Sequence, residues 1–296
     1  MMRSASGLER LEACPASEAL PHAPYAGEAA ETGTENHRVI EEVINAGGVP
    51  ERLEDLFAGS EQVHTEIAYV IDVVARTSRR IGKLAAARDY GKLGATEVAM
   101  TLDVEIVHAD RIAVIDWKSR SRVTPAERNL QILAQMCAVE SHYGLGGQAG
   151  LVYLDNMERD MAPFSLLDSG ARWSRLARVV ERAGKGIPSA GSHCRYCPAL
   201  LSCPTQKAAL TTFMSSELSD DLPVERLGEI WVELQVLEAK AEQVRKAIQL
   251  RAKREPVPLP SGKLLRLVES SRSSYDAKAM ASELSSRGVD PEQFKR

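Results

Sequence analysis

Alternating apolar and polar positions predict a β-sheet in the first half of the chain. One such run covers residues 63–74, and two more cover residues 97–107 and 111–118. Only residues 108–110 separate the last two runs, and a break this short suits a β-hairpin. A short apolar run at residues 150–154 predicts a further strand.

Helical patterns alternate with these strands, which together indicate an α/β fold. The chain is expected to be helical over residues 1–47, with Gly47 and Gly48 as the stop. The other predicted helices cover residues 76–92 (in part), 125–142 and 167–183. Thr124 is the expected N-cap of the helix at 125–142, because Pro125 suits the first helical position.

The C-terminal third begins with a heptad pattern. Its apolar positions are spaced alternately three and four residues apart: Leu227, Ile230, Leu234, Leu237, Ala241, Val244 and Ile248. This spacing predicts a long amphipathic helix within residues 224–254, which packs on the body or offers a surface for oligomerisation or for a recombination partner. A strand-like run at 263–268 and a helix near 277–287 are expected after it. We therefore expect a core at residues 1–205 and an extension at 206–296.

Composition narrows the class of protein. The 296 residues are 44% hydrophobic and 26% charged, which is typical of a globular chain and excludes disordered, collagen-like and disulfide-scaffold proteins. The sequence has no apolar run long enough for a membrane span and no secretory signal, so a cytoplasmic location is expected. Residues 240–296 carry 13 basic and 7 acidic residues, although the whole chain has a net charge of −4. This basic tail suits either a polyanionic partner or a solvated helix face.

Three of the five cysteines form a cluster with metal-ligand spacing. Cys194, Cys197 and Cys203 lie in one loop, and the odd cysteine count argues against a disulfide framework. A closed site needs a fourth ligand, for which His193 and Cys14 are candidates. Cys14 ends a short predicted helix at residues 6–13, stopped by Pro15. Spacing alone leaves zinc and iron–sulfur open. The fifth cysteine, Cys137, lies in an apolar helical pattern and is expected to be a buried hydrophobe.

The predicted hairpin carries the main chemical signal. Asp103 lies on its first strand, and Asp116 and Lys118 end its second strand on a shared face, because strand residues two apart point the same way. Trp117, between them, is expected to point into the opposite layer. Two carboxylates on adjacent strands can hold a hard divalent cation, and the lysine can position a water or offset charge. A surface ion pair is the alternative interpretation.

These residues resemble the PD-(D/E)XK nuclease signature. The segment Gly33-Thr34-x-x-His37 resembles the GTxxH element of the RecB-type branch, and Gln131 resembles the start of its QxxxY element. One cysteine near the N-terminus and three near residue 200 resemble the iron–sulfur members of that branch, which include CRISPR adaptation nucleases, AddB-type helicase-nucleases and phage exonucleases. The resemblance covers roughly residues 4–205.

The resemblance implies a restriction-endonuclease-like core, a mixed sheet flanked by helices, with a C-terminal helical extension. It implies that His37, Asp103 and Asp116, with the carbonyl of Trp117, bind Mg²⁺ or Mn²⁺, and that Lys118 is catalytic with Gln131 in support. It also implies a 4Fe–4S cluster on four cysteines, Cys14, Cys194, Cys197 and Cys203. The implied activity is hydrolysis of DNA, by an exonuclease that acts on duplex ends or single strands.

Some residues depart from the family pattern or stay outside it. Met100, Thr101 and Leu102 replace the glycine-rich run before the first acid, and Gln135 replaces the tyrosine of QxxxY. The strand-borne acids, Glu66 and Glu97, are interpreted as solvated residues. Two other functions stay open: an inactive DNA-binding or assembly subunit on a nuclease scaffold, and a zinc-stapled regulatory module built on the heptad helix.

Overall fold

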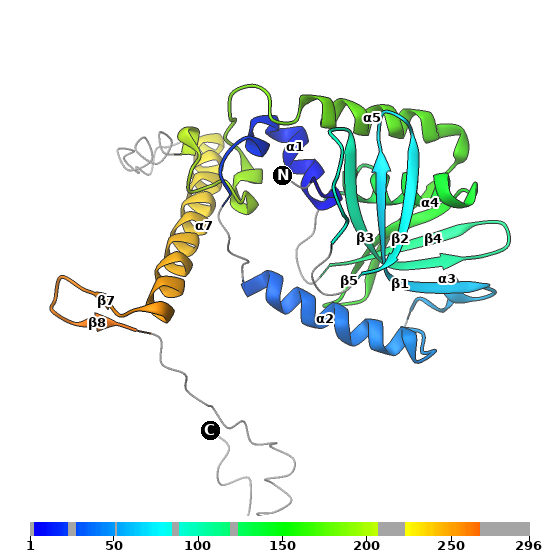
Figure 1. The fold of residues 1–296 in the computed structure, drawn as a ribbon, viewed down its shortest axis with the longest axis horizontal. Coiled ribbons are helices and arrows are strands. Elements are labelled where there is room, and N and C mark those ends of the chain that lie inside the picture. Colours follow the sequence, from blue (N-terminus) through cyan, green and yellow to red (C-terminus); the bar gives the residue numbers. More distant parts are fainter. Residues whose placement is uncertain are drawn as a thin grey trace, which may run out of the picture. The chain divides into compact units, whose positions relative to one another are not determined.

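A computed structural model describes residues 3–22, 28–50, 52–84, 89–118, 124–206 and 223–266 (Figure 1). The side chains of residues 28–36, which include Gly33 and Thr34, and the whole of 267–296 lie outside the described part. Two compact units divide the chain at residues 1–244 and 245–296. In the described ranges, no helix is both long enough and apolar enough to cross a membrane.

The first unit is built on a six-stranded mixed sheet of order β2-β1-β3-β4-β5-β6. All neighbours are antiparallel except β4 and β5, which are parallel. The strands are β1 Gln62–Asp72, β2 Thr77–Lys83, β3 Glu97–Val107, β4 Ile112–Lys118, β5 Gly147–Tyr153 and β6 Glu158–Phe164. The α/β prediction is confirmed, as is the hairpin of β3 and β4.

In the described part of residues 76–92 the predicted helix is wrong, and the two edge strands of the sheet were not predicted. Residues 76–92 were expected to be partly helical, but Thr77–Lys83 forms β2, which pairs along β1 at the edge of the sheet. Its charged residues, Arg79 and Arg80, hide the apolar alternation by which strands are recognised. Such charges are common on edge strands, where they discourage pairing with another chain. The other edge strand, β6, is equally polar and was missed for the same reason.

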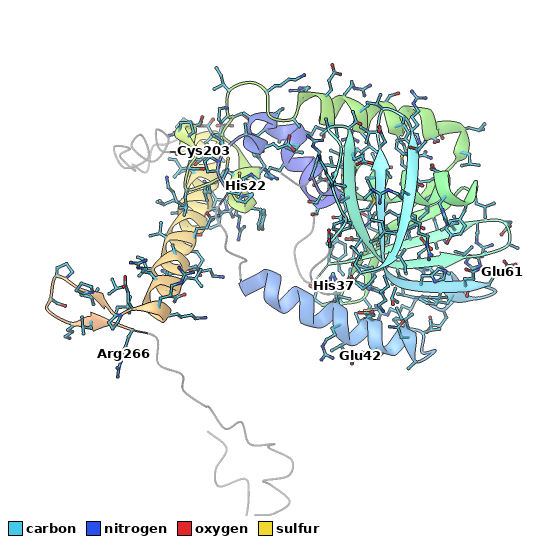
Figure 2. The ribbon with its side chains drawn as sticks, viewed as in Figure 1. His22, His37, Glu42, Glu61, Cys203 and Arg266 are labelled. Carbon is cyan, nitrogen blue, oxygen red and sulfur yellow. The ribbon has the colours of Figure 1, made fainter. Side chains whose placement is uncertain are left out.

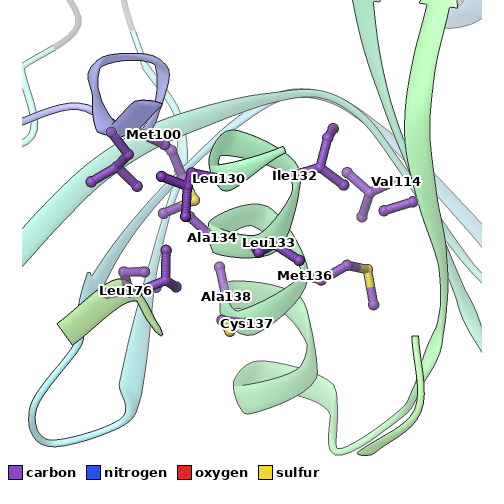
Figure 3. Close-up of a cluster of buried hydrophobic side chains, with 14 of the residues drawn as sticks. Met100, Val114, Leu130, Ile132, Leu133, Ala134, Met136, Cys137, Ala138 and Leu176 are labelled. Atoms are coloured by element: carbon purple, nitrogen blue, oxygen red, sulfur yellow. The ribbon is translucent and has the colours of Figure 1, made fainter. Parts of the chain in front are cut away.

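Helices cover both faces of the sheet. One face packs on α1 (Leu8–Ala13), α4 (Leu130–Tyr143) and α5 (Ser169–Arg182), and Figure 3 shows α4 between sheet residues such as Val114 and Leu176 of α5. Cys137 lies fully buried in this core, as predicted. The other face packs on α2 (Glu28–Asn45) and α3 (Glu54–Phe57), which contribute Ile44 and Leu56.

Helix α4 begins five residues later than predicted, at Leu130. The actual cap is Asn129, whose side-chain oxygen accepts the N–H groups of Gln131 at 2.9 Å and Ile132 at 3.2 Å. Residues 125–128 form a turn instead, which is held where the N–H of Ala126 donates to Asp160 at 3.0 Å. A cap that satisfies two helix-end donors outweighs the preference of proline for the first turn.

The N-terminal segment is a chain of short helices, where one helical region over 1–47 was expected. A 3₁₀ turn, η1 (Ala5–Gly7), leads into α1, and a second one, η2 (Pro15–Glu18), follows Cys14 before α2. Pro15 has no backbone N–H to continue α1, so the chain turns at Cys14. The short helix expected at 6–13 is confirmed by α1.

The long helix is confirmed as α7, Val224–Arg254. A two-stranded sheet of β7 (Val257–Pro258) and β8 (Leu264–Leu265) follows it. The strand predicted at 263–268 thus begins at Leu264, and the helix expected near 277–287 lies outside the described residues.

Candidate active site and cysteine site

Three carboxylates occupy one row across three adjacent strands. Strands β1 and β3 pair on both sides of Glu66, through Thr65 with Val104 and Ile67 with Leu102, so Glu66 stands opposite Asp103. Strands β3 and β4 pair through Val104 and Ile115, so the next residue pair along is Asp103 with Asp116. Strand register therefore aligns three acidic residues, of which the first and the last are 50 residues apart in the chain.

The ladder between β3 and β4 ends at this row. Beyond Val104 and Ile115, the carboxylate of Asp103 replaces the missing backbone acceptor: its Oδ2 accepts the N–H of Trp117 at 2.7 Å. In a strand the N–H and C=O of one residue point to the same neighbour, so the Trp117 carbonyl also faces β3. The Trp117 ring is buried on the α2 side of the sheet, as the alternation predicted.

Glu66 has a left-handed backbone, with φ of 53°, which is uncommon for a residue with a side chain. Side-chain alternation breaks there: Ile67 packs in the core on the α4 side, whereas the Thr65 hydroxyl donates to Asn45 of α2 at 2.9 Å. Strain of this kind is concentrated at functional sites. The Glu66 carboxylate lies near His37 and Asp103, where periodicity alone would predict an ordinary strand position.

Glu66, His37 and Asp103 form a group of potential metal ligands. Each offers one ligand atom, and all three atoms lie within 4.8 Å of one another. His37 Nδ1 is 3.5 Å from Asp103 Oδ1, and Figure 2 shows His37 on the side of α2 that faces the sheet. Glu66, interpreted from the sequence as a solvated residue, is partly buried and belongs to this group. Glu97, by contrast, only accepts the N–H of Gly94 in a nearby loop.

Asp116 is buried, and its two oxygens have different surroundings. Oδ1 accepts hydrogen bonds from Gln131 at 2.5 Å and Gln135 at 3.2 Å, two residues one turn apart on α4. Oδ2 accepts no hydrogen bond of normal geometry and faces Lys118 Nζ at 2.5 Å. Lys118 also donates to Gln131 at 3.2 Å. The sequence indicated Gln131 but missed the structural role of Gln135, whose only signal is its i, i+4 spacing from Gln131.

Burial and the neighbouring carboxylates shift the pKa values of Asp116, Lys118 and His37. Burial raises the pKa of Asp116, Lys118 opposes that shift, and Asp103 adds to it. Burial lowers the pKa of Lys118, but the neighbouring Asp116 outweighs burial and the net shift is upward. His37 behaves in the same way: burial lowers its pKa, and its hydrogen bond with Asp103 leads the contributions that raise it.

This donor set fits a hard divalent cation. Two carboxylates, Glu66 and Asp103, form a compact group with His37. The predicted ligand Asp116 lies outside that group, next to Asp103 in the row, and its buried Oδ2 has no hydrogen-bond donor of proper geometry. Mg²⁺ and Mn²⁺ prefer such oxygen ligands, and an imidazole can complete the shell. Around them a cavity opens, whose wall includes Ser4 and Ser6 of the N-terminal turn and Tyr90, which hydrogen-bonds Thr101 at 2.6 Å.

Four cysteines line a second, separate cavity: Cys14, Cys194, Cys197 and Cys203. All four are buried and none is in a disulfide. Cys14 ends α1, while Cys194 lies in the turn η4 (Ser192–Tyr196) and the other two follow it. The loop is tied to the N-terminal segment where Ser189 donates to the Ala13 carbonyl at 2.9 Å.

The thiols of this cavity have shifted pKa values. Burial raises the pKa of Cys194 and of Cys197, and neighbouring cysteines add to the shift. Gln206 Nε2 donates to Cys194 Sγ at 3.2 Å. His193, the other candidate ligand, also lines the cavity, but its Nε2 lies 3.1 Å from the Ser189 carbonyl. The structure thus brings the four predicted cysteines to one place and leaves Cys137 in the core.

Comparison with known proteins identifies a family. A family model described as "Protein of unknown function (DUF2800)" matches residues 2–296, nearly the whole chain. No curated protein matches the chain. Among the solved structures that match is one titled "Crystal structure of SSO0001", which is 17% identical and covers 61% of this chain and 72% of its own. Its TM-score of 0.34 is too low to carry an argument.

Proposed function

The chain belongs to the DUF2800 family, and we propose that it is a divalent-metal-dependent DNA nuclease with a PD-(D/E)XK core. One observation carries the proposal: Glu66, Asp103 and Asp116 stand in one row over three strands, with Lys118 beside the last of them. A nuclease of this type needs acidic ligands and a lysine at one phosphate-sized site. The likeness of the motifs to exonucleases supports action at DNA ends or on single strands.

The proposed metal ligands are the group His37, Glu66 and Asp103, joined by Asp116 from the neighbouring strand, with the Trp117 carbonyl on the β3 side. A bound Mg²⁺ or Mn²⁺ would polarise the scissile phosphate and lower the pKa of the attacking water. Glu66 is the addition to the sequence-based set. Its strained backbone supports a functional role, because an ordinary solvated glutamate gains nothing from a left-handed conformation.

Lys118 acts as a cation in this proposal. The neighbouring Asp116 raises its pKa and favours the protonated side chain. The ammonium can hold the attacking water by a hydrogen bond and offset the negative charge that develops on the phosphate. Its contact with Gln131 at 3.2 Å fixes its direction when Asp116 is shared with a metal.

We propose that the four cysteines hold a 4Fe–4S cluster. They line one cavity and come from the two ends of the first 205 residues, the arrangement that the resemblance to iron–sulfur nucleases implies. The donor from Gln206 to Cys194 is the kind of N–H···S contact that tunes such clusters. The role of the cluster would be to connect α1 to the loop after α5.

The test is cleavage of end-labelled DNA, single-stranded and duplex, by anaerobically purified protein with Mn²⁺ or Mg²⁺. We expect cleavage by the wild type and a loss of several orders of magnitude in Asp116→Asn. The matched control is Asp110→Asn, in the exposed turn between β3 and β4, which should cleave at the wild-type rate.

Two results would overturn the proposal. Cleavage by Asp116→Asn at the wild-type rate would remove the assigned site. Absence of cleavage by every protein, on both substrates and with both metals, would favour the inactive scaffold. The ladder of labelled products distinguishes attack at ends from internal cuts.

A further inference from the structure

Helix α7 packs on the cysteine loop with only one of its faces. Val236 and Ala239 contact the apolar cluster that contains Cys194 and Leu200. One turn further on, Gln243 Nε2 donates to the Cys197 carbonyl at 3.3 Å. These three helix residues, spaced three and four apart, define the face of α7 that the rest of the first unit covers.

The heptad face of α7 points elsewhere. With 3.6 residues per turn, the centre of the stripe Leu227–Val244 lies about 157° around the helix from the covered face. Within the described residues its ends are open: Leu227 is 45% exposed and Val244 is 43% exposed. Trp231, on the border of the stripe, is 60% exposed. Ile230, Leu234 and Leu237, between these ends, are partly buried. A regular apolar stripe opposite the covered face of its helix, with open ends, is typical of a helix that pairs with another helix.

We propose that this stripe binds the same stripe of a second copy of the chain, as an antiparallel pair of α7 helices. A heptad stripe is self-complementary in shape, so a second copy is an occupant that fits without further assumptions. What selects the antiparallel direction is the charge beside the stripe. The charged flanking residues are Arg226, Glu233, Glu238, Lys240 and Arg245.

A parallel pair would place like charges together. In that arrangement Glu233 meets the partner's Glu238, and Lys240 meets the partner's Arg245. The antiparallel pair with Leu227 opposite the partner's Val244 instead places Glu233 beside the partner's Lys240. Two-fold symmetry repeats this contact, so the dimer has two attractive pairs where the parallel form has repulsive ones.

The apolar layers also fit in the antiparallel register. Leu234 lies opposite the partner's Leu237 at the centre, and the small Ala241 lies opposite the larger Ile230 of the partner. Residues 227–244 span about 27 Å at 1.5 Å per residue. Because the helix is already formed in each copy, association does not have to order it, which lowers the cost of a short contact.

The test is sedimentation equilibrium of the full chain, from about 1 to about 100 μM, the range in which a contact of this size associates. We expect the mass to rise from monomer to dimer across the series. Glu233→Lys alone and Lys240→Glu alone should each weaken the dimer by about tenfold or more, because one substitution turns two attractive pairs repulsive. The double variant exchanges the charges and should restore wild-type association.

Matched controls lie on the same helix outside the stripe. Glu225→Lys and Lys253→Glu make the same charge changes at exposed positions and should leave association unchanged. A wild type that stays monomeric throughout would overturn the proposal, as would single variants that dimerise normally. Stronger dimerisation of Glu233→Lys would overturn the antiparallel direction, because that result belongs to a parallel pair. The outcome is independent of DNA cleavage, so it neither rescues nor refutes the proposed nuclease.

Discussion

The carboxylate of Asp103 accepts the backbone N–H of Trp117 at 2.7 Å, at the point where β3 and β4 cease to pair. One oxygen of Asp103 thus completes the sheet, while the other faces His37 at 3.5 Å. The side chain that closes the ladder is also a candidate metal ligand. Asp103 therefore belongs both to the end of the β3–β4 ladder and to the candidate metal site.

Two substitutions of Asp103 should separate these roles. Asp103→Asn retains an oxygen that can accept the Trp117 N–H, whereas Asp103→Ala leaves that donor unpaired in a mostly buried place, at a cost of about 1–3 kcal/mol. We expect denaturant unfolding to show the alanine variant as the less stable of the two by that amount. Both should lose Mn²⁺ binding. Equal stabilities would show that the hydrogen bond to Trp117 does not support the fold.

Substitution of Glu66 should weaken metal binding without affecting the fold. We expect Glu66→Gln to lower Mn²⁺ affinity at least about tenfold in calorimetric titration without DNA, because a neutral amide is a poorer ligand than a carboxylate. The matched control, Glu97→Gln, lies on β3 away from the cluster and should bind as the wild type does. Normal Mn²⁺ affinity in Glu66→Gln would show that Glu66 is not a metal ligand.

Gln135 should position Asp116. Gln135→Met keeps the side-chain volume but removes one of the two donors to Asp116 Oδ1, so the carboxylate gains freedom to rotate. We expect DNA cleavage to fall about 10–100-fold, as is typical when an outer hydrogen bond to a metal ligand is lost. Circular dichroism should show an unchanged fold. Cleavage at the wild-type rate would leave Gln131 as the only positioning residue on α4.

Loss of one cluster cysteine should release the N-terminal segment. Cys197→Ser should lose iron and absorbance near 400 nm in the anaerobic protein, and its thermal midpoint should fall because a cross-link between residues 14 and 203 is gone. The control, Cys137→Ser, changes a core cysteine outside the cavity and should retain iron. Zinc in place of iron in the wild type would replace the cluster by a single ion.

Cys137 should make stability fall at high pH. Burial raises the pKa of its thiol to about 12, from 9.0 in an unfolded chain. Its contribution is complete below pH 9 and is lost as the pH rises toward 12, because the unfolded chain releases this proton first. The difference in unfolding free energy between the wild type and Cys137→Ala should shrink by about 1.4 kcal/mol per pH unit above pH 9. A constant difference would contradict the raised pKa.

Local periodicity was enough to predict those strands and helices whose apolar pattern lies within one continuous segment. The alternation in β3 and β4 placed Asp116 and Lys118 on one face and Trp117 on the other, and the heptad spacing determined α7. Cysteine spacing indicated the loop site. The position of Cys14 at the end of a short helix made it a candidate for the fourth ligand.

Only the tertiary structure decided which distant groups share a site. Register between β1 and β3 aligned Glu66 with Asp103, and the left-handed backbone of Glu66 breaks the side-chain alternation there, which no local pattern encodes. Asn129 replaced Thr124 as the cap of α4, which set the rotation that aims Gln131 and Gln135 at Asp116. Strand β2 is identified only by its pairing with β1 in the structure. The register of β1 with β3 joins residues far apart in the sequence, so its energy is absent from any single segment. The cap of α4 is local, and the long-range contact beside it is the hydrogen bond from the Ala126 N–H to Asp160, which holds the turn before Asn129.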